Sequence, residues 1–487
     1  MPSTYALTEA LLIAGLLTLG LLSAHLTLLS IARIALPPRR LVERLPAEAE
    51  LPEVLVQVPL YNEGALVHRV LAHLTALDWP RERLHIQVLD DSNDGSLDTS
   101  RAAVDALVSA GWHIELRHRR DRTAFKAGAL AAGLEVSRAS FVAIFDADFM
   151  PPADFLRRTI GVLCADPQLG YVQTRWLHTN RTDNLLTRAQ ARLLDGHFRV
   201  EQEARHRLGL PVPFNGTGGV WRRRTIDAAG GWHGDTLTED LDLSLRARLC
   251  GWRSAYLPGL GVPGMLPESP RAWRLQQFRW TKGFVECLLK LAPSVWTSPR
   301  LPLWQKVMVT LQLIQPLAFL VGCLSIVAGL PYIAGVAQPG PLLSAIAIGM
   351  ACGGLLGPIS LLALGARDQA GVLDKVLEGA AALFLSSGLL LSNARAGLEA
   401  LVRRRSEFVR TPKARTADRS QQAKPCRCGV VELIAGCTLA LFTMLEQPAA
   451  ILPLALAVGG LVGFGAMQIA ESRDTSSRTA KALGKVD

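Results

Sequence analysis

Two pairs of aspartates follow apolar runs in this chain. Asp90 and Asp91 come after the run HIQVL, and Asp146 and Asp148 come at the end of the run FVAIF. A single Asp after a strand is ordinary turn chemistry, but two acidic clusters at strand ends predict that a positive group binds there. Asp146 and Asp148 could hold Mg²⁺ or Mn²⁺ and leave its other positions for diphosphate oxygens and water. Taken alone, this D-x-D pattern is equally compatible with a solvated acidic turn.

The chain lacks the glycine-rich loops that usually bind phosphate groups. Neither a Walker motif nor G-x-G-x-x-G follows the first apolar run, at 54–58. Backbone amides are therefore not expected to bind a diphosphate. A phosphorylated ligand would need a metal ion held by carboxylates.

Two later motifs carry groups suited to proton transfer and to anion binding. Thr238 stands where it can cap a helix, and Glu239 and Asp240 after it would favour a helix N-terminus. Alternatively, one of these carboxylates is the general base for a hydroxyl. Further on, Arg279 could neutralise a departing phosphate and Trp280 could stack on a sugar ring. An amphipathic interfacial helix would also explain the second motif.

The elements that must position these groups alternate between strands and helices. Five short apolar runs predict strands. They lie at 54–58, 85–89, 112–116, 141–145 and 171–174. Their alternation with helical segments predicts an open, mostly parallel sheet, which binds ligands at the carboxyl ends of its strands. Both acidic pairs fall at that edge. The helix expected after Thr238 would bury Leu241, Leu245 and Leu249.

The composition indicates a membrane protein that also carries a globular domain. The 487 residues are 49% hydrophobic and 19% charged, against about 25% charged in a typical soluble domain. The net charge of +10 does not predict a nucleic-acid partner, because Arg clusters flank apolar runs as in membrane proteins. The eight Cys show no paired zinc-ligand spacing, and reduced thiols are expected.

Charge and hydropathy together predict five membrane spans. Residues 6–32 are apolar, and the segment that follows them is rich in Arg. The first span should therefore deliver the chain to the cytoplasm. Later apolar stretches lie at 307–330, 342–366, 376–398, 430–446 and 449–470. If all of them crossed, the Arg-rich loop 402–429 would lie outside, against the positive-inside rule. We therefore expect 376–398, whose continuation is amphipathic, to lie at the interface.

The expected organisation is that of a multi-pass integral membrane protein of the bacterial inner membrane or an equivalent membrane, with its globular domain in the cytoplasm. Its parts are a membrane helix at 1–36, the domain at 50–300, membrane and interfacial helices at 301–401, a cytoplasmic loop at 402–429, a membrane hairpin at 430–471 and a cytoplasmic tail at 472–487.

Nine motifs occur in the same order as in the processive membrane family 2 glycosyltransferases. They are VPLYNE, QVLDDSND, FKAGAL, FDADFMPP, VQTRW, FNGTGGVWRR, AAGGW, TEDLDLSLRA and QQFRW. Over residues 50–290, order and spacing are most similar to the cellulose-synthase-like mannan and glucomannan synthases. A tenth motif, EFVRTPK, resembles the F-x-V-T-x-K gating loop of cellulose synthases through Phe408, Thr411 and Lys413, with Arg410 where Val is usual.

The resemblance implies a nucleotide-sugar transferase fold of family A type, with an open mixed sheet, and a role for each matching residue. Asp240 would be the catalytic base with Glu239 beside it, and Asp146 and Asp148 would bind Mg²⁺ or Mn²⁺. The implied donor-binding residues are Asp90, Asp91, Lys126, Asp146, Gln276 and Arg279, and the implied acceptor-binding residues are Trp280, Phe214, Asn215 and Gly216.

Two departures from the family pattern bear on the donor. Thr123 and Ala124 stand where a basic residue and Gly usually precede the aromatic residue and K-A-G. Gly264 and Met265 stand where an acid is common before Leu-Pro. The core chemistry is intact, but the identity of the donor sugar is left open.

The function expected from the resemblance is that of an inverting glycosyltransferase, moving a hexose from GDP-mannose or UDP-glucose to a growing β-linked polysaccharide. The nearest alternative transfers one sugar to a lipid, ceramide or diacylglycerol. A non-catalytic scaffold or a transporter is a third possibility. The presence of Asp146, Asp148, Asp240 and Arg279 argues against it, although proline within the spans is compatible with a transporter. Accessory subunits and homo-oligomers are left open.

Overall fold

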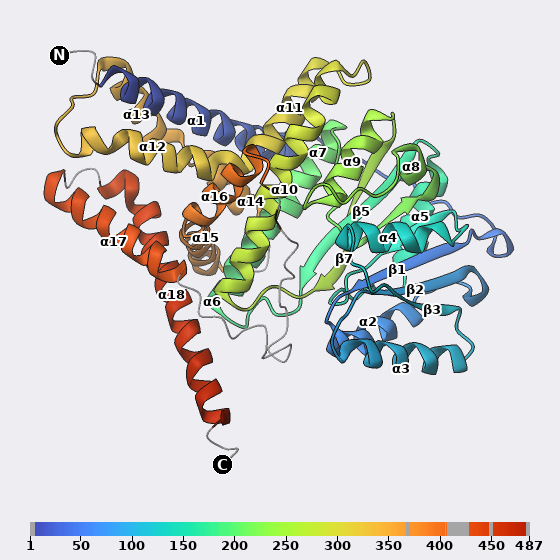
Figure 1. The fold of residues 1–487 in the computed structure, drawn as a ribbon. Helices are drawn as coiled ribbons and strands as arrows, with labels where there is room; N and C mark the ends of the chain where they lie inside the picture. The colour runs from blue at the N-terminus through green and yellow to red at the C-terminus, as the bar shows by residue number, and fades with distance from the viewer. Residues whose placement is uncertain (1–4, 367–370, 405, 407–427, 448–450, 484–487) are drawn as a thin grey trace.

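The computed structural model describes residues 5–366, 371–404, 406, 428–447 and 451–483. A sheet domain lies at one end of the molecule and a group of long apolar helices at the other (Figure 1). The long helix α10 (Pro270–Thr297) connects the two parts. The functional groups predicted from the sequence must therefore be sought where α10 meets the sheet.

The sheet has seven strands in the order β3-β2-β1-β4-β6-β5-β7. The first four strands in the chain pair in parallel, as their alternation with helices predicts, while β6 pairs antiparallel with β4 and β5. The sheet is therefore mixed, as the family resemblance implies. The strands are β1 (Val54–Leu60), β2 (Leu84–Asp90), β3 (Ile114–His118), β4 (Phe141–Ile144), β5 (Leu169–His178), β6 (Gly219–Arg222) and β7 (Arg253–Gly264).

The sequence did not predict strands β6 and β7, and the reason is recognisable. β6 is four residues long and begins in a glycine-rich motif, and β7 contains Pro258 and Pro263. Proline lowers the expectation of a strand because it cannot donate a ladder hydrogen bond. β7 tolerates both prolines because it is the edge strand, paired only with β5.

Helices cover both faces of the sheet, and the strand alternation decides which face each helix covers. Val54, Val56 and Val58 of β1 face a core shared with α2 and α5, whereas Leu55 faces a second core shared with α4 and α9. Consequently α4 and α9 lie on the same face. The helices are α2 (Gly64–Thr75), α3 (Ser96–Ser109), α4 (Phe125–Glu135), α5 (Phe155–Ala165), α6 (Leu185–Gly196), α7 (Glu203–Leu208), α8 (Arg223–Ala228) and α9 (Glu239–Leu249), with short turns η1 (Glu48–Glu50), η2 (Arg81–Arg83) and η3 (His197–Gln202).

Five helical segments among the described residues are long and apolar enough to cross a membrane, and the chain is an integral membrane protein. They are Ala6–Ala35, Leu303–Ile333, Pro341–Gly365, Gly429–Glu446 and Leu454–Arg473. The segment expected at the interface forms two helices, Val372–Ser387 and Leu390–Leu401, bent by 51°. The helices are α1 (Ala6–Ala35), α11 (Leu303–Ile314), η4 (Gln315–Leu317), α12 (Ala318–Ile333), α13 (Pro341–Gly353), α14 (Leu356–Gly365), α15 (Val372–Ser387), α16 (Leu390–Leu401), α17 (Cys428–Glu446) and α18 (Ile451–Leu483).

The ends of several apolar helices contact the sheet domain or α10. Near the start of α17, Glu432 pairs with Arg274 at 3.4 Å. In α18, the Glu471 carboxylate accepts a hydrogen bond from the backbone N–H of Arg271 at 3.2 Å. Within α15, Glu378 pairs with Arg181 at 2.8 Å. These charged contacts join the two parts of the molecule.

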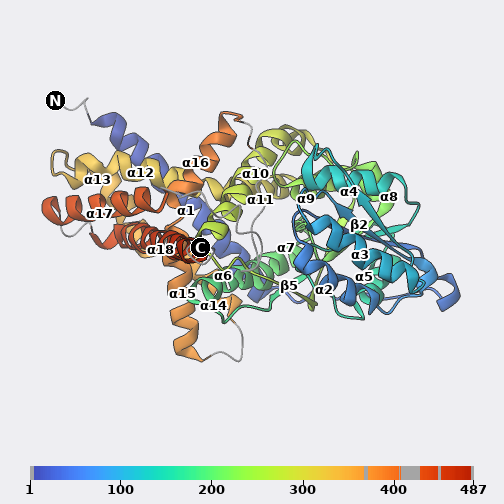
Figure 2. The ribbon, with the colours of Figure 1, turned by 60° about the horizontal axis from the view of Figure 1, so that its bottom comes forward.

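The first helix runs from the far end of the bundle to the domain. Near its start, the Glu9 carboxylate accepts from the backbone N–H of Gly340, before α13. Near its end, Arg33 donates to the carbonyl of Arg199 at 3.0 Å, in η3. Figure 2 shows the N-terminal end of α1 near α12 and α13, remote from the sheet.

Candidate active site

Lys126 lies at the centre of the charged groups that the sequence singles out. It is in the first turn of α4, and its ammonium is 2.6 Å from Asp146 Oδ1 and donates to the Gly216 carbonyl at 2.9 Å. Burial alone would lower the pKa of this ammonium, but the carboxylates of Asp146, Glu239 and Asp240 raise it. The lysine therefore offsets part of the acidic charge for which the sequence predicted a metal ion.

Asp146 and Asp148 both lie at the carboxyl edge of the sheet, immediately after β4. The Asp148 side chain is buried, and its Oδ2 accepts from the backbone N–H of Met265 at 3.0 Å. The Asp146 side chain is 30% exposed, so a ligand can reach it. Two carboxylates beside an accessible edge are a donor set that fits Mg²⁺ or Mn²⁺ bound to a diphosphate.

A second acidic cluster in the described residues has the spacing of a metal site. His233, Asp235 and Asp242 offer ligand atoms within 4.8 Å of one another. The Lys290 ammonium, however, is 2.7 Å from Asp235 and 2.8 Å from Asp242. This cluster already holds a cation, and it forms a support between α9 and α10.

Asp240 stands in the first turn of α9, which begins at Glu239 as predicted. Burial, reinforced by the neighbouring Glu239 carboxylate, raises the pKa of Asp240 to about 7. The backbone N–H of Leu241 donates to Asp240 Oδ1 at 2.8 Å and fixes the carboxyl group. A carboxylate with a pKa near neutrality can accept a proton from a hydroxyl and release it again.

The packing of α9 confirms one local prediction and corrects another. Leu241 and Leu245 are buried against α10 and α11, with Leu249 packed against the same cluster, as the apolar spacing predicts. Thr238 occupies the N-cap position, but its side chain makes no capping hydrogen bond. Its hydroxyl lies 3.5 Å from Cys287 Sγ instead, because α10 passes directly beside it.

Gly216 lies between the side chains of Lys126 and Asp240. Its φ of +79° belongs to the left-handed region, and a Cβ there would lie 3.0 Å from Asp240 Oδ2 and 3.4 Å from Lys126 Nζ. Glycine is therefore needed both for the backbone conformation and for the space. Asp240 lies on one side of this glycine, and the Lys126–Asp146 pair adjoins the same residue.

Arg279 joins this group from α10. Burial lowers the pKa of its guanidinium to about 10, against the opposing effect of the Glu239 and Asp146 carboxylates. The group therefore remains charged at neutral pH. Gln276 and Trp280, half-buried on the same helix, lie within one turn of Arg279. The predicted residues Lys126, Asp146, Glu239, Asp240 and Arg279 are thus close enough to influence one another electrostatically.

The other predicted donor contacts, Asp90 and Asp91, lie two strands away from Asp146, at the end of β2. Asp90 is fully buried, and its Oδ1 accepts from the backbone N–H of Ser92 at 2.7 Å. Both carboxylate oxygens of Asp91 are hydrogen-bonded by the guanidinium of Arg119, at 2.9 and 2.6 Å. Nothing in the sequence identified Arg119 as a partner.

One residue assigned to the acceptor side belongs to the core. Phe214 is 1% exposed and packs against Tyr171 and Trp221 beneath the sheet. Its side chain supports the glycine-rich turn from within the core. A pattern of motifs could not reveal this, because the burial depends on which way the turn faces the sheet.

Asn215, the next residue, contacts a segment that sequence reasoning missed. Its Oδ1 accepts from Gln202 at 2.7 Å, and its Nδ2 is 3.2 Å from His197 Nε2. These two residues are the first and last of η3, a π-helical turn. Such turns often occur at functional sites, but the sequence of η3 carries no recognisable signal for one.

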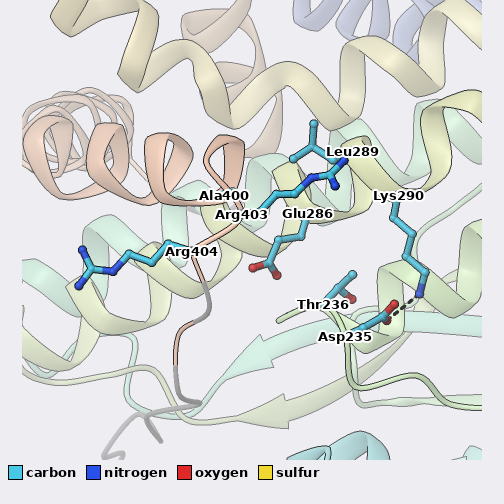
Figure 3. A pocket seen from close by; sticks show the side chains of 8 residues that line it. All are labelled: Asp235, Thr236, Glu286, Leu289, Lys290, Ala400, Arg403 and Arg404. Carbon is cyan, nitrogen blue, oxygen red and sulfur yellow. Dashed lines mark hydrogen bonds and ion pairs between the residues drawn. The ribbon is translucent and has the colours of Figure 1, made fainter.

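A cavity of about 280 Å³ lies next to the start of α9. Figure 3 shows Asp235 and Thr236 on one side, with Glu286 and Lys290 of α10 and Arg403 at the end of α16 around it. The segment before α9, the helix α10 and the end of α16 therefore meet here. The predicted gating residues Phe408, Thr411 and Lys413 lie outside the described residues.

Residues 52–283 match the family model described as glycosyltransferase like family 2. This part of the chain is therefore similar to the family 2 glycosyltransferases. Its sequence is 41% identical over 266 residues to a probable glucomannan 4-β-mannosyltransferase 6 of Oryza sativa subsp. japonica, and 42% identical over 260 residues to glucomannan 4-β-mannosyltransferase 9 of Arabidopsis thaliana. The alignments cover 54% and 53% of this chain and 46% and 49% of those proteins. The chain thus spans about half the length of the curated relatives it matches.

A solved structure shares the fold of the glycosyltransferase domain, and the match extends beyond that domain. It is a mannosyltransferase from Pyrobaculum calidifontis in complex with GDP-Man and Mn²⁺, with a TM-score of 0.55 and 20% sequence identity. The match covers 82% of this chain and 100% of that one. Together with the mixed sheet, it confirms the expected family A type of fold.

Proposed function

We propose that this protein is an inverting hexosyltransferase that moves a hexose from a nucleotide sugar to a growing β-linked polysaccharide. The observation that carries the proposal is the arrangement around Gly216. Asp240, a carboxylate with a pKa near 7, lies across Gly216 from the Lys126 ammonium. Lys126 and Arg279 both interact electrostatically with the carboxylate of Asp146, a candidate metal ligand. A base next to a site for a leaving diphosphate is what direct displacement at an anomeric carbon requires.

In the proposed reaction, Asp240 accepts the proton of an acceptor hydroxyl. The hydroxyl oxygen forms a bond to the anomeric carbon while the bond from that carbon to the diphosphate oxygen breaks. Lys126 and Arg279 hold the negative charge that develops on the diphosphate. A single displacement inverts an α-linked donor to a β-linked product, and no nucleophilic side chain is needed.

We also propose that Asp146 and Asp148 hold Mg²⁺ or Mn²⁺ when the donor binds. The ion would supply positive charge to the diphosphate oxygens. Calorimetry of GDP and UDP binding with and without a chelator tests the requirement. Equal affinity in both conditions would remove the metal from the proposal.

The curated relatives favour mannose as the hexose and a polysaccharide as the acceptor, because they are named glucomannan 4-β-mannosyltransferases. GDP-mannose is therefore the first donor to test, followed by UDP-glucose. Membranes containing the protein would be incubated with labelled nucleotide sugars, and the product would be sized and tested for β-linkage. We expect long β-linked chains from wild type and none from Asp240→Asn. One sugar on a chloroform-extractable lipid would establish the lipid alternative instead.

For the topology we propose five spans, with the domain, the loop 402–429 and the C-terminal tail on the cytoplasmic side. Three observations support it: the first helix ends at the domain, α17 begins beside Arg274, and α18 contacts Arg271. The bent pair α15 and α16 is also joined to the domain through Glu378, within α15, and to α10 through Arg404, just after α16, which supports a segment that does not cross.

Cysteine labelling tests this topology. In intact cells, a cysteine from Arg403→Cys should be protected from an impermeant reagent. A cysteine from Val336→Cys, at the exposed turn after α12, should react. The parent protein corrects for its native cysteines. Labelling of the first and protection of the second would reverse the orientation.

A further inference from the structure

The loop between β3 and α4 has a strained backbone. Ala124 and Phe125 have φ angles of +59° and +48°, in the left-handed region that residues with a Cβ rarely adopt. Two such residues in succession persist only when their surroundings hold them. Ala124 and Phe125 both carry a Cβ, so this loop needs support from its surroundings.

Arg119 supplies that support. Its Nη2 donates to the Phe125 carbonyl at 2.9 Å, and its Nη1 donates to the Thr123 carbonyl at 3.3 Å. Its Nε and Nη2 also donate to the two oxygens of Asp91, at 2.9 and 2.6 Å. The planar guanidinium can make these contacts together because its donors form a rigid fork. The strained turn is thereby tied to the end of β2.

The loop leads directly into the catalytic groups. Lys126 is the next residue after Phe125, and its ammonium reaches Asp146 and the Gly216 carbonyl. The loop also packs closely against the segment that leads to α9, since a Cβ on Gly234 would lie 2.4 Å from the Ala124 Cβ. A shift of this turn would therefore move Lys126 and disturb the approach to Asp240.

We propose that Arg119 is a positioning residue that holds this turn so that Lys126 faces the donor diphosphate, and that Asp91 acts through Arg119 and not on the donor. This inference rests on the proposed function for the role of Lys126. The side chain of Asp91 is only 5% exposed and that of Arg119 is 21% exposed. Both Asp91 oxygens are already engaged, so the pair works as one unit.

A double-mutant cycle tests whether the two residues work as a unit. Arg119→Gln and Asp91→Asn are each expected to lower kcat/KM for the donor by about 10- to 100-fold, as supporting residues of an active site do. The double variant should be no worse than Arg119→Gln alone. Losses that multiply would mean that Asp91 contacts the donor independently, which would overturn its assignment. Arg120→Gln, an exposed neighbour, is the matched control and should have wild-type kinetics.

Relief of the strain is the second test. Ala124→Gly should restore part of the lost kcat/KM in the Arg119→Gln background, because glycine adopts the left-handed conformation without a Cβ penalty. A general loss of structure would not be rescued in this way. Arg119→Lys keeps the charge but not the fork, and should resemble Arg119→Gln more closely than wild type. Absence of rescue, or full activity in Arg119→Lys, would refute the positioning role.

Limited trypsin digestion separates this inference from the proposed function, because it needs no transfer activity. Arg120, Arg122 and Lys126 remain cleavable in every Arg119 variant. Release of the turn should make cleavage there at least several-fold faster, with Ala124→Gly slowing it again. Equal cleavage rates in wild type and Arg119→Gln would overturn the inference even if the protein proves to be a transferase. Faster cleavage of Arg119→Gln, without any transfer by wild type, would support the positioning role of Arg119 and refute the proposed transferase function.

Discussion

Replacement of Gly216 by alanine should impair turnover far more than it impairs folding. Gly216 and Gly231 share the same φ of +79°, so an alanine at either position meets the same backbone strain of about 1–2 kcal/mol. At Gly231 nothing lies within 4 Å of the new Cβ. At Gly216 the Cβ would be 3.0 Å from Asp240 Oδ2, about 0.4 Å closer than ordinary contact at 3.4 Å.

The difference between the two variants isolates the effect on the base. Both should lose thermal stability by a similar few degrees, at roughly 2–4 °C per kcal/mol for a large domain. A misplacement of about 1 Å in an active site can cost about 100-fold in rate, so a shift of a few tenths of an ångström predicts a kcat about tenfold lower for Gly216→Ala. Gly231→Ala should keep the wild-type kcat. Melting curves and initial rates with saturating donor provide both measurements. Equal kcat values in the two variants would show that Gly216 does not adjoin the catalytic base.

The same site and its supports lead to four more expectations. Because the proposed base Asp240 must be deprotonated to accept a proton, kcat/KM should fall about tenfold per pH unit below about 7; a profile that is flat from pH 5 to 8 would exclude this base. Asp240→Asn should cost about 10²–10⁴ in rate yet raise the melting temperature at neutral pH. The elevated pKa means that the stability contributed by this group is lost as pH rises from about 4 to 7; a lower melting temperature would contradict the assignment. Lys282→Met should lower the melting temperature by several degrees, because the fully buried ammonium binds the Arg404 carbonyl and pairs with Glu399 at 3.6 Å; an unchanged melting curve would refute that support. Trp280→Ala, measured with the same donor, should shorten or abolish polymer while sparing hydrolysis of the donor by water, because the indole is proposed as the acceptor platform; polymer of wild-type length would remove it from that role.

The sequence was sufficient to predict the parts of the fold that local forces determine. The first five strands were predicted from short apolar runs, and the boundaries of β1 to β4 lie within two residues of those expected, whereas β5 begins two residues earlier and ends four residues later. The strands β6 and β7 were missed because glycine and proline weaken the strand signal, while pairing with β5 stabilises them. Tertiary contacts outweigh local preference in such strands.

The sequence predicted most residues of the candidate site but not how they are arranged in space. The motifs identified Asp146, Asp240 and Arg279, yet gave no reason to expect that Lys126 would contact Asp146 and Gly216. The motifs also assigned Phe214 to the acceptor side, whereas its side chain is buried in the core. The order of the motifs shows which residues are present, whereas the direction in which each side chain points depends on how its segment packs on the sheet.

What the sequence by itself determined is therefore what can be read over short distances: which segments are apolar enough to cross a membrane, where strands end in acids, and where α9 begins. Those features depend on hydrophobic periodicity and on backbone chemistry within a few residues. Only the tertiary structure decided the partners of each charge. The alternation of side chains along β1 places α4 and α9 on one face, and the crossing of α10 adds Arg279 to them. Electrostatic and hydrogen-bonding energies depend on separations of a few ångströms, which the order of residues along the chain does not contain.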